Sequence, residues 1–320
     1  MIWLLTGGAG YIGAHVARAL VAAGDDVVVV DDLSSGLTER IASLPLVRAD
    51  LTEGPDPLAA AMTAHGVTGV VHLAAKKSVA ESVQRPVHYY EQNVGGTAAL
   101  LRAAATAGVR HVLYSSTAAV YGESTEELVD ETSPTAPSNP YGESKLAAEW
   151  LIRSAAAAHG MSWASLRYFN VAGAADSVLA DRGRSNLLPI VLRAADREEP
   201  VEIFGGDWPT PDGTCIRDYV HVEDLADAHV AMAESLRTGS VRSGVFNVGR
   251  GDGVSVLQML DAVHRVTGRP VRRRVVDRRP GDPARVVADP SAIAAAIGWR
   301  AKRDVDDIVG SAWKAYRPGT

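Results

Sequence analysis

The chain has 320 residues, of which 47% are hydrophobic and 22% are charged, and its net charge at pH 7 is −6. This composition is typical of a globular protein and excludes a disordered, collagenous or coiled-coil chain. The acidic balance disfavours a binder of nucleic acid or of anionic membranes, since both need a cationic surface.

Neither a targeting segment nor a membrane span is expected. The start, Met1–Leu5, lacks the basic region of a signal peptide, and no apolar stretch approaches the roughly 18 residues that span a membrane. The single cysteine, Cys215, excludes an intrachain disulfide, and the nine histidines show no metal-ligand spacing, so no metal site is expected. We therefore expect a cytoplasmic, enzyme-sized protein of about two domains or one large α/β unit.

Short apolar runs alternate with helical patterns in the first half of the chain, which is typical of a parallel sheet with crossover helices. The expected strands are Ile2–Thr6, Val27–Asp31, Val70–Ala74, His111–Ser115 and Ser162–Tyr168. The expected helices between them lie around Ile12–Ala23, Pro57–His65 and Val94–Ala107. Apolar strands of this length suit a sheet that is covered on both faces.

After Phe169 the pattern changes, and residues 173–215 are rich in Gly, Pro, Asp and Trp. The later expected elements are helices around Leu188–Asp196, Val256–Thr267 and Asp304–Tyr316 and a strand at Val245–Val248. The sequence thus predicts an α/β protein with a doubly wound parallel sheet in residues 1–170, to which 219–250 return. A smaller C-terminal α/β domain is expected from residues 171–218 and 251–320.

A glycine-rich loop joins the first expected strand to the first expected helix. Gly7, Gly10 and Gly13 let the backbone turn sharply and approach a pyrophosphate at the helix N-terminus. Asp31 ends the next strand, where a carboxylate binds the adenosine ribose and repels a 2′-phosphate. With Asp32 beside it and no arginine between Asp31 and Arg40, NAD is favoured over NADP. A tight turn with surface aspartates is the alternative.

Tyr141 and Lys145 stand four residues apart at the start of an expected helix. Residues at this spacing share one helix face, so the ammonium can lie close to the phenol. A phenol titrates near pH 10 unperturbed, so a general base near neutral pH needs a positive field. An exposed aromatic–lysine contact is the alternative interpretation.

Six segments together resemble one known family. They are TGGAGYIG from Thr6, SSTAAVYG from Ser115, YGESK from Tyr141, LRYFNVAG from Leu166, DGTCIRDYVH from Asp212 and RPGD from Arg279. The first three resemble the extended short-chain dehydrogenase/reductase superfamily, and the last three, from the expected substrate half, resemble its UDP-glucose 4-epimerases.

The resemblance implies a Rossmann domain that binds NAD, a second domain that binds a UDP-sugar, and 4-epimerisation of UDP-hexoses through a 4-keto intermediate. Tyr141 matches the catalytic base, Lys145 the residue on the nicotinamide ribose, and Thr117 a proton-relay hydroxyl. The matching cofactor residues are Gly7, Gly10, Tyr11, Ile12, Gly13, Asp31, Asp32, Asp50, Leu51, Leu73, Ala74, Ala75, Lys77, Asn93, Ser115, Tyr141, Lys145 and Tyr168. The matching substrate residues are Thr117, Tyr141, Asn170, Asn186, Leu187, Ile203, Phe204, Arg217, Tyr219, Arg279, Asp282 and Val286.

Some of these assignments leave alternatives open. Asp50 can meet the adenine edge or be a solvated loop carboxylate. Thr117 stands where the family usually has serine, which keeps the hydroxyl but adds a methyl group. Gln92 and Asn93 stand where many members have two asparagines, so either can be the one that contacts the cofactor. Val286 stands where a tyrosine closes the sugar pocket, so room for an N-acetyl group is expected, unless the valine only fills a core.

Two other functions remain as alternatives. A nucleotide-sugar 4,6-dehydratase needs carboxylates after the threonine, where this chain has Ala118 and Ala119. A catalytically silent NAD sensor would not need the Tyr141–Lys145 pair. Small residues along the Tyr141 helix suit close helix packing, either within the chain or across the two-fold axis of a homodimer, which the resemblance favours.

Overall fold

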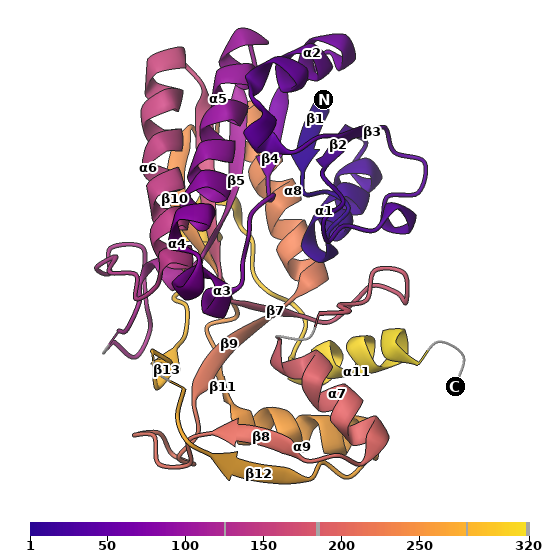
Figure 1. Ribbon diagram of the computed structural model, residues 1–320, viewed down its shortest axis with the longest axis vertical. Coiled ribbons are helices and arrows are strands. Elements are labelled where there is room, and N and C mark those ends of the chain that lie inside the picture. Colours follow the sequence, from indigo (N-terminus) through magenta and orange to yellow (C-terminus); the bar gives the residue numbers. More distant parts are fainter. Residues whose placement is uncertain (125, 184–185, 280, 318–320) are drawn as a thin grey trace.

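The computed structural model describes residues 1–124, 126–183, 186–279 and 281–317. Its centre is a seven-stranded sheet in the order β10-β6-β5-β4-β1-β2-β3, in which every neighbouring pair is parallel (Figure 1). The strands are β1 (Ile2–Thr6), β2 (Asp26–Asp31), β3 (Leu46–Arg48), β4 (Gly69–His72), β5 (His111–Thr117), β6 (Ser162–Tyr168) and β10 (Ser243–Val248). The strand order reverses between β1 and β4, and ligands of such sheets bind at the carboxyl ends of the strands beside that point.

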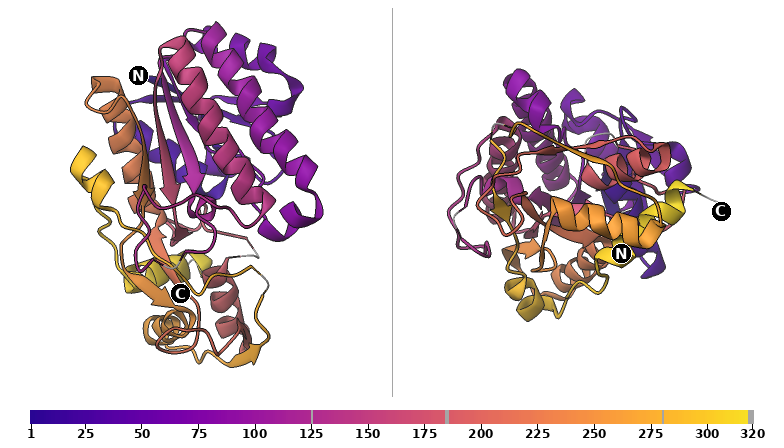
Figure 2. Two further views of the ribbon diagram at one scale, coloured as in Figure 1. Left: turned by 90° about the vertical axis from the view of Figure 1, so that its left-hand side faces the viewer. Right: turned by 90° about the horizontal axis from the view of Figure 1, so that it is seen from below.

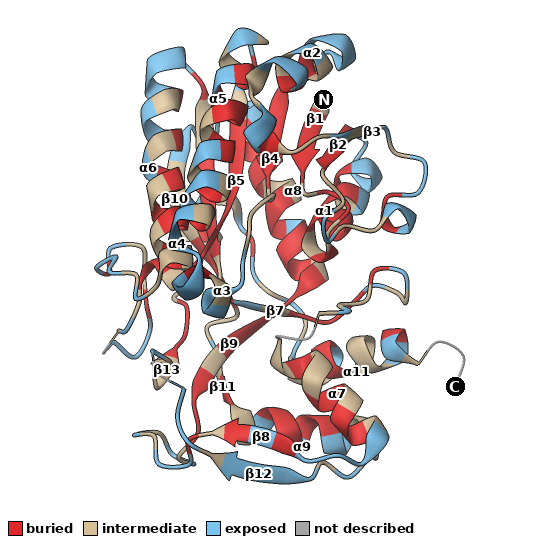
Figure 3. Cartoon of the chain, in the orientation of Figure 1, coloured by how far each residue is buried: buried red, intermediate tan, exposed pale blue. Residues whose placement is uncertain are grey.

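Helices cover both faces of this sheet because successive side chains of each strand point to opposite sides. Trp3 and Leu5 of β1 pack in one core with α1 (Tyr11–Ala22) and α8 (Val222–Thr238). Leu4, between them, packs in another core. The helices of that opposite face are α2 (Pro55–His65), α5 (Gly96–Thr106) and α6 (Pro140–His159). Figure 2 shows the layers edge-on, and Figure 3 shows the buried strands between half-exposed helices.

Short helical segments connect these elements. They are η1 (Thr38–Arg40), η2 (Leu51–Glu53), α3 (Val79–Gln84), α4 (Pro86–Tyr89), η3 (Tyr90–Gly95) and η4 (Ala118–Val120). Segment η3 is a π-helical turn directly before α5, so the helix expected from Val94 begins regular α-helical winding at Gly96. Such turns are frequent at functional sites.

The second part of the molecule lies beyond the carboxyl ends of the large sheet (Figure 1). A four-stranded sheet joins β7 (Asn170–Ala172), β9 (Ile216–His221), β11 (Gly253–Ser255) and β13 (Arg285–Val286) around β9. A parallel pair is formed by β8 (Val201–Phe204) and β12 (Arg273–Val276). The helices α7 (Leu187–Arg197), α9 (Val256–Thr267) and α11 (Val305–Tyr316) enclose a separate core with these strands.

One stretch of residues 251–320, which the sequence places in the smaller domain, packs against the large sheet instead. Helix α10 (Ser291–Ile297) contacts β10 and α8, and Ile293 and Trp299 belong to the core of the large sheet. Asp224 at the start of α8 holds this stretch, because its carboxylate accepts the backbone N–H groups of Lys302 and Arg303 at 3.0 and 2.9 Å. Among the described helices, none is both long and apolar enough to cross a membrane.

Candidate active site

The glycine loop forms a cradle in which Gly7 and Gly13 have no room for a side chain. Gly7 has a φ of +70°, and a Cβ there would lie 2.8 Å from the backbone nitrogen of Ala74. A Cβ on Gly13 would lie 2.1 Å from the carbonyl oxygen of Gly7. Helix α1 begins at Tyr11 without a side-chain cap and without an acidic residue in its first turn. Its N-terminal amides and dipole therefore suit an anionic group such as a pyrophosphate.

Asp31 ends β2 beside this loop and is almost completely buried. Its Oδ2 accepts the N–H of Ala9 at 2.9 Å and its Oδ1 accepts the N–H of Leu33 at 2.9 Å. Burial raises the pKa of Asp31, and these two backbone donors act against the rise. A carboxylate has about four acceptor positions, so two remain for the hydroxyls of a ribose.

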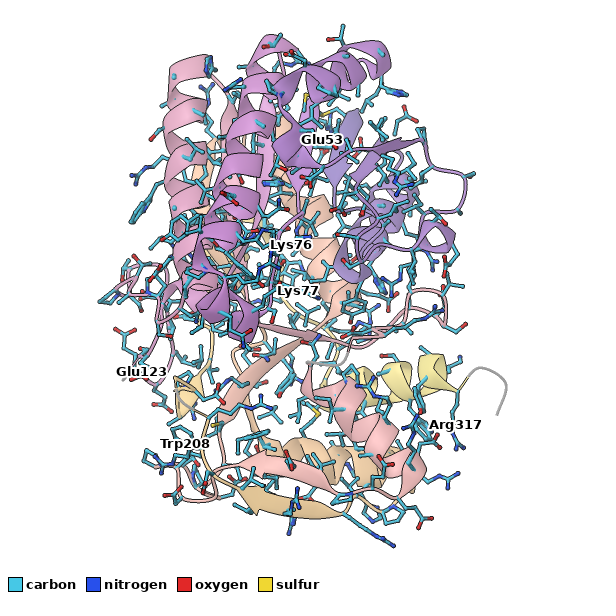
Figure 4. All side chains as sticks on the ribbon, in the orientation of Figure 1. Glu53, Lys76, Lys77, Glu123, Trp208 and Arg317 are labelled. Atoms are coloured by element: carbon cyan, nitrogen blue, oxygen red, sulfur yellow. The ribbon has the colours of Figure 1, made fainter. Side chains whose placement is uncertain are left out.

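A cleft of about 580 Å³ runs from the glycine loop to the Tyr141 helix. Most of the expected cofactor residues line it: Gly7, Gly10, Tyr11, Ile12, Gly13, Asp31, Asp32, Asp50, Leu51, Leu73, Ala74, Ala75, Lys77, Tyr141, Lys145 and Tyr168. Figure 4 shows two lysines of this wall, Lys76 and Lys77, in the segment after β4. The shape, the phosphate cradle and the ribose acceptor together fit a dinucleotide.

Two of the expected cofactor residues do not line the cleft. Asn93 is buried, and its amide bonds the backbone N–H and C=O of Lys76 at 2.8 and 3.0 Å and the hydroxyl of Ser144 at 2.9 Å. Gln92, its neighbour, lines the cleft instead. The Ser115 hydroxyl is buried against Nε2 of His229 at 2.8 Å.

Sequence reasoning missed several cleft residues, namely Ser34, Ser35, Leu37, Arg40, Lys76, Asp181, Arg182 and Gly183. The last three belong to a segment that long-range bonds hold against the first domain. Arg40 donates to the carbonyl oxygen of Ala180 at 2.8 Å, and the Tyr11 hydroxyl donates to that of Gly173 at 2.6 Å. No local pattern in the sequence signals contacts over such separations.

The expected catalytic pair lies on α6, which begins at Pro140. Asn139 caps the helix, because its Oδ1 accepts the N–H of Gly142 at 3.0 Å. Lys145 is 2% exposed, and its Nζ donates to the carbonyl oxygen of Ser115 at 2.6 Å and lies 4.3 Å from the centre of the Tyr114 ring. Burial lowers the pKa of Lys145 to about 7, with Glu149 acting in the opposite direction.

Tyr141 meets the end of strand β5. Burial raises the pKa of its phenol, and the neighbouring Thr117 side chain acts against the rise. Thr117 also accepts the N–H of Ala119 at 3.2 Å and so opens the short helix η4. The two residues after Thr117 are alanines, so no carboxylate stands where a dehydratase needs its acid and base.

The expected substrate residues gather around β9. In the strand register Asn170 of β7 faces Tyr219, and Val286 of β13 faces Arg217. Arg217 lies 3.9 Å from the carboxylate of Asp282.

Further substrate residues reach this region from other elements. The guanidinium of Arg279 lies 3.5 Å from the centre of the Phe204 ring at the end of β8. Asn186 directly precedes α7 and donates to Asp181 at 2.7 Å, and Leu187 is the first residue of that helix. Ile203 is 1% exposed, so its side chain belongs to the core. Among the described residues, no group of three or more His, Cys, Asp or Glu could hold a metal ion.

Known proteins resemble this chain in both sequence and structure. The chain is 44% identical to a UDP-glucose 4-epimerase of Streptomyces lividans over 98% of this chain and 95% of that one. It is similar in structure to a UDP-glucose 4-epimerase of Stenotrophomonas maltophila with bound NAD and formylated UDP-arabinopyranose, with a TM-score of 0.94, 40% identity, and coverage of 98% and 97%. It is also similar to the UDP-Glc/GlcNAc 4-epimerase of Campylobacter jejuni, with a TM-score of 0.86, 36% identity, and coverage of 98% of each chain.

The model of the NAD dependent epimerase/dehydratase family matches residues 3–249. This range holds the glycine cradle, the ribose acceptor Asp31 and the Tyr141–Lys145 pair. Both the sequence match and the cleft that these residues share lead to one conclusion: the chain belongs to the NAD dependent epimerase/dehydratase family.

Proposed function

We propose that the protein interconverts UDP-glucose and UDP-galactose by NAD-dependent epimerisation at carbon 4 of the sugar. The observation that carries this proposal is the position of Tyr141, beside Thr117 and one helix turn from Lys145, at the end of a dinucleotide cleft. The relatives named above as UDP-glucose 4-epimerases, which match nearly the full chain, support the same activity.

The residues of the cleft fit NAD in chemistry as well as in size. The glycine cradle would hold the pyrophosphate, Asp31 the adenosine ribose, and Lys145 the nicotinamide ribose. The chemistry that NAD supplies when bound is reversible hydride transfer at carbon 4 of the sugar.

Tyr141 would take the proton from the sugar 4-hydroxyl, directly or through Thr117. Burial alone favours the neutral phenol, so the base needs a positive charge beside it. The ammonium of Lys145 provides such a charge from the same helix face, and the carbonyl of Ser115 stabilises its protonated form. In the return step, the Tyr141 hydroxyl gives the proton back to the sugar oxygen.

The UDP half of the substrate would be held by residues of the second part of the molecule. Arg217 and Arg279 offer guanidinium groups that match phosphate oxygens, and Asn170 and Asn186 offer amides. Anchoring the nucleotide leaves the sugar free to turn over as the 4-keto intermediate. It also prevents escape of the ketose, which would leave the enzyme with reduced cofactor.

We infer that UDP-N-acetylglucosamine is a substrate as well. Valine at position 286 is several heavy atoms smaller than a tyrosine and would leave more room for a 2-acetamido group. The similar protein from Campylobacter jejuni is named as an epimerase of both sugars, which supports this range.

We also propose that the protein is a homodimer through the Tyr141 helix. Trp150 of α6 is 52% exposed, and the neighbouring segments α3, α4 and η3 expose Val83, Val87 and Tyr90. Exposed apolar side chains that gather on neighbouring elements mark interaction sites, and two-fold dimers are the commonest oligomers.

The test is incubation of the purified protein with UDP-glucose, UDP-N-acetylglucosamine or UDP-glucuronate, followed by separation of the products. We expect the 4-epimers of the first two. Tyr141→Phe should lower kcat at least about 100-fold, the usual scale for deletion of a general base, while the bound NAD and the fold remain. Absence of any 4-epimer from the wild type, or full activity of the variant, would reject the proposal.

A further inference from the structure

A buried ion pair between Glu149 and Arg167 lies next to the carboxyl end of β5. The Ser116 hydroxyl donates to the carboxylate of Glu149. Arg167 of β6 grips the same carboxylate with two parallel bonds, Nε to Oε1 at 3.0 Å and Nη2 to Oε2 at 2.7 Å. Ser116, Glu149 and Arg167 are 0%, 3% and 5% exposed, so none of the three exchanges its partner for water.

The network continues from the ion pair toward the second part of the molecule. Nη1 of Arg167 donates to the Tyr121 hydroxyl at 3.1 Å, which donates to Oδ1 of Asn247 at 2.7 Å. The Asn247 amide donates to the carbonyl oxygen of Val129 at 2.8 Å. The position of Val129 is also fixed, because its N–H donates to the carbonyl oxygen of Val287 at 2.8 Å. The chain of bonds therefore ends next to the expected sugar wall in β13.

Glu149 lies on the same face of α6 as Tyr141 and Lys145. Three consecutive residues at the end of β5 meet three residues spaced by four on α6. The carbonyl oxygen of Ser115 accepts from Lys145, the Ser116 hydroxyl donates to Glu149, and Thr117 lies beside Tyr141. Residues at this spacing lie on one helix face. Glu149 is the only carboxylate of this set, and it is the one whose own position a second strand fixes through Arg167.

We propose that Glu149 is a positioning residue for the epimerisation, which holds the end of β5 and α6 in the register that aligns Thr117 with Tyr141 and Ser115 with Lys145. The inference rests on the proposed function, because the two aligned contacts belong to the reaction described there. A displacement of about 1 Å at such contacts costs up to about 100-fold in rate.

The charge of Glu149 supports the same role. The ionisable groups that face Lys145 are Tyr141 and Glu149 on α6, Tyr114 on β5 and His72 on β4. Of these, Glu149 is the one whose charge favours the ammonium form, since burial keeps His72 and the two tyrosines neutral. Its loss would also leave Arg167 as an uncompensated buried charge that repels the ammonium.

The first experiment removes the Ser116 bond and leaves every charge in place. Ser116→Ala is compared with Ser165→Ala, a matched control on the neighbouring strand β6, because Ser165 is equally buried and its hydroxyl has no partner within the described part of the chain. We expect Ser116→Ala to lower kcat for UDP-glucose about 10-fold with little change in KM, and Ser165→Ala to act like wild type. Equal kcat values for the two variants would overturn the proposal.

The second experiment removes the charge. Glu149→Gln is compared with Asp224→Asn, because Asp224 is also a buried carboxylate paired with an arginine, Arg303, but lies away from the cleft. Both variants should lower the Tm. Glu149→Gln should lower kcat about 10- to 100-fold, and its activity should be lost at lower pH on the alkaline side, because Lys145 gives up its proton earlier. Asp224→Asn should keep the wild-type pH profile, and the same profile in Glu149→Gln would overturn the proposal.

A third measurement separates failure of this inference from failure of the proposed function. The rate at which the holoenzyme releases bound NAD is measured for all four variants, which needs no epimerase activity. If Lys145 is displaced, Ser116→Ala and Glu149→Gln should release NAD several-fold faster than their matched controls. If the wild type does not epimerise any sugar, the proposed function fails, and unchanged NAD release would then reject the positioning role as well.

Discussion

Tyr141 and Lys145 lie where burial favours the neutral form of both side chains. Burial raises the pKa of the phenol, and it lowers the pKa of the amine to about 7. The contacts that act against these shifts come from Thr117, Ser115 and Glu149, all within one turn of α6 or at the end of β5. The ability of the pair to exchange a proton near neutral pH therefore depends on a few short contacts.

Two substitutions of Thr117 test whether its hydroxyl relays a proton. Thr117→Ala removes the hydroxyl and should lower kcat by about 10-fold or more, although less than Tyr141→Phe. Thr117→Ser keeps the hydroxyl and loses only the methyl group, so it should retain most of the activity. The measurement is steady-state kcat with UDP-glucose. If serine is as damaging as alanine, the methyl group packs and the hydroxyl relays no proton.

Substitutions of Val286 test which of the two UDP-sugars the protein accepts. Val286 is 8% exposed and packs with Val120, Tyr121 and Phe169. If the position lies against the sugar, as we propose, a tyrosine there extends toward the 2-substituent. Val286→Tyr should abolish the reaction of UDP-N-acetylglucosamine and spare that of UDP-glucose, as judged by the two kcat/KM values. Val286→Leu, which adds little volume, should keep both reactions. Equal loss of both sugars in the tyrosine variant would show that Val286 only fills the core.

At the scale of elements, the start of α6 positions the catalytic pair, because the residues at this start determine where the helix begins. Asn139 caps the helix and Pro140 occupies its first position, where no N–H is needed. Tyr141 follows at once, so the cap determines where the phenol stands.

Asn139→Ala should therefore affect both stability and activity. Loss of a cap costs about 1 kcal/mol in the free energy of unfolding, and fraying of the first turn should lower kcat severalfold. Ser78→Ala removes the cap of the short peripheral helix α3 and provides the control. That variant should keep the wild-type kcat. Urea denaturation and steady-state kinetics distinguish the two, and an unchanged kcat in Asn139→Ala would contradict the coupling.

The elements that the sequence predicts are those with strong local patterns. The strand, glycine loop and helix at the start of the chain follow from periodicity and from residues that only a tight turn requires. The spacing of Tyr141 and Lys145 placed them on one face for the same reason. The choice between Gln92 and Asn93 needed the structure, because it depends on Lys76 and Ser144, which lie far from them in sequence. The return of α10 to the large sheet likewise rests on long-range bonds to Asp224.

At the scale of the whole molecule, the exposed apolar side chains test the proposed dimer. Trp150→Glu places a charge in the patch of α3, α4, η3 and α6, and it should give monomers in sedimentation or light-scattering measurements. Val275→Glu is the matched control, since Val275 is 58% exposed but lies on β12 in the other part of the molecule. It should leave a dimer intact. A monomeric wild type would reject the dimer altogether.

The pairing of α1 with α8 has a consequence for the order in which the chain can fold during synthesis. Val16 and Leu20 of α1 are buried in the core that includes Leu225 and Met232 of α8, some 200 residues later. The last strand of the large sheet, β10, follows α8. The part of this face that α8 covers therefore stays exposed until more than two thirds of these 320 residues have been made, and contacts of such long range form slowly. During that interval the newborn chain presents an apolar surface on which chaperones can act and aggregation can begin.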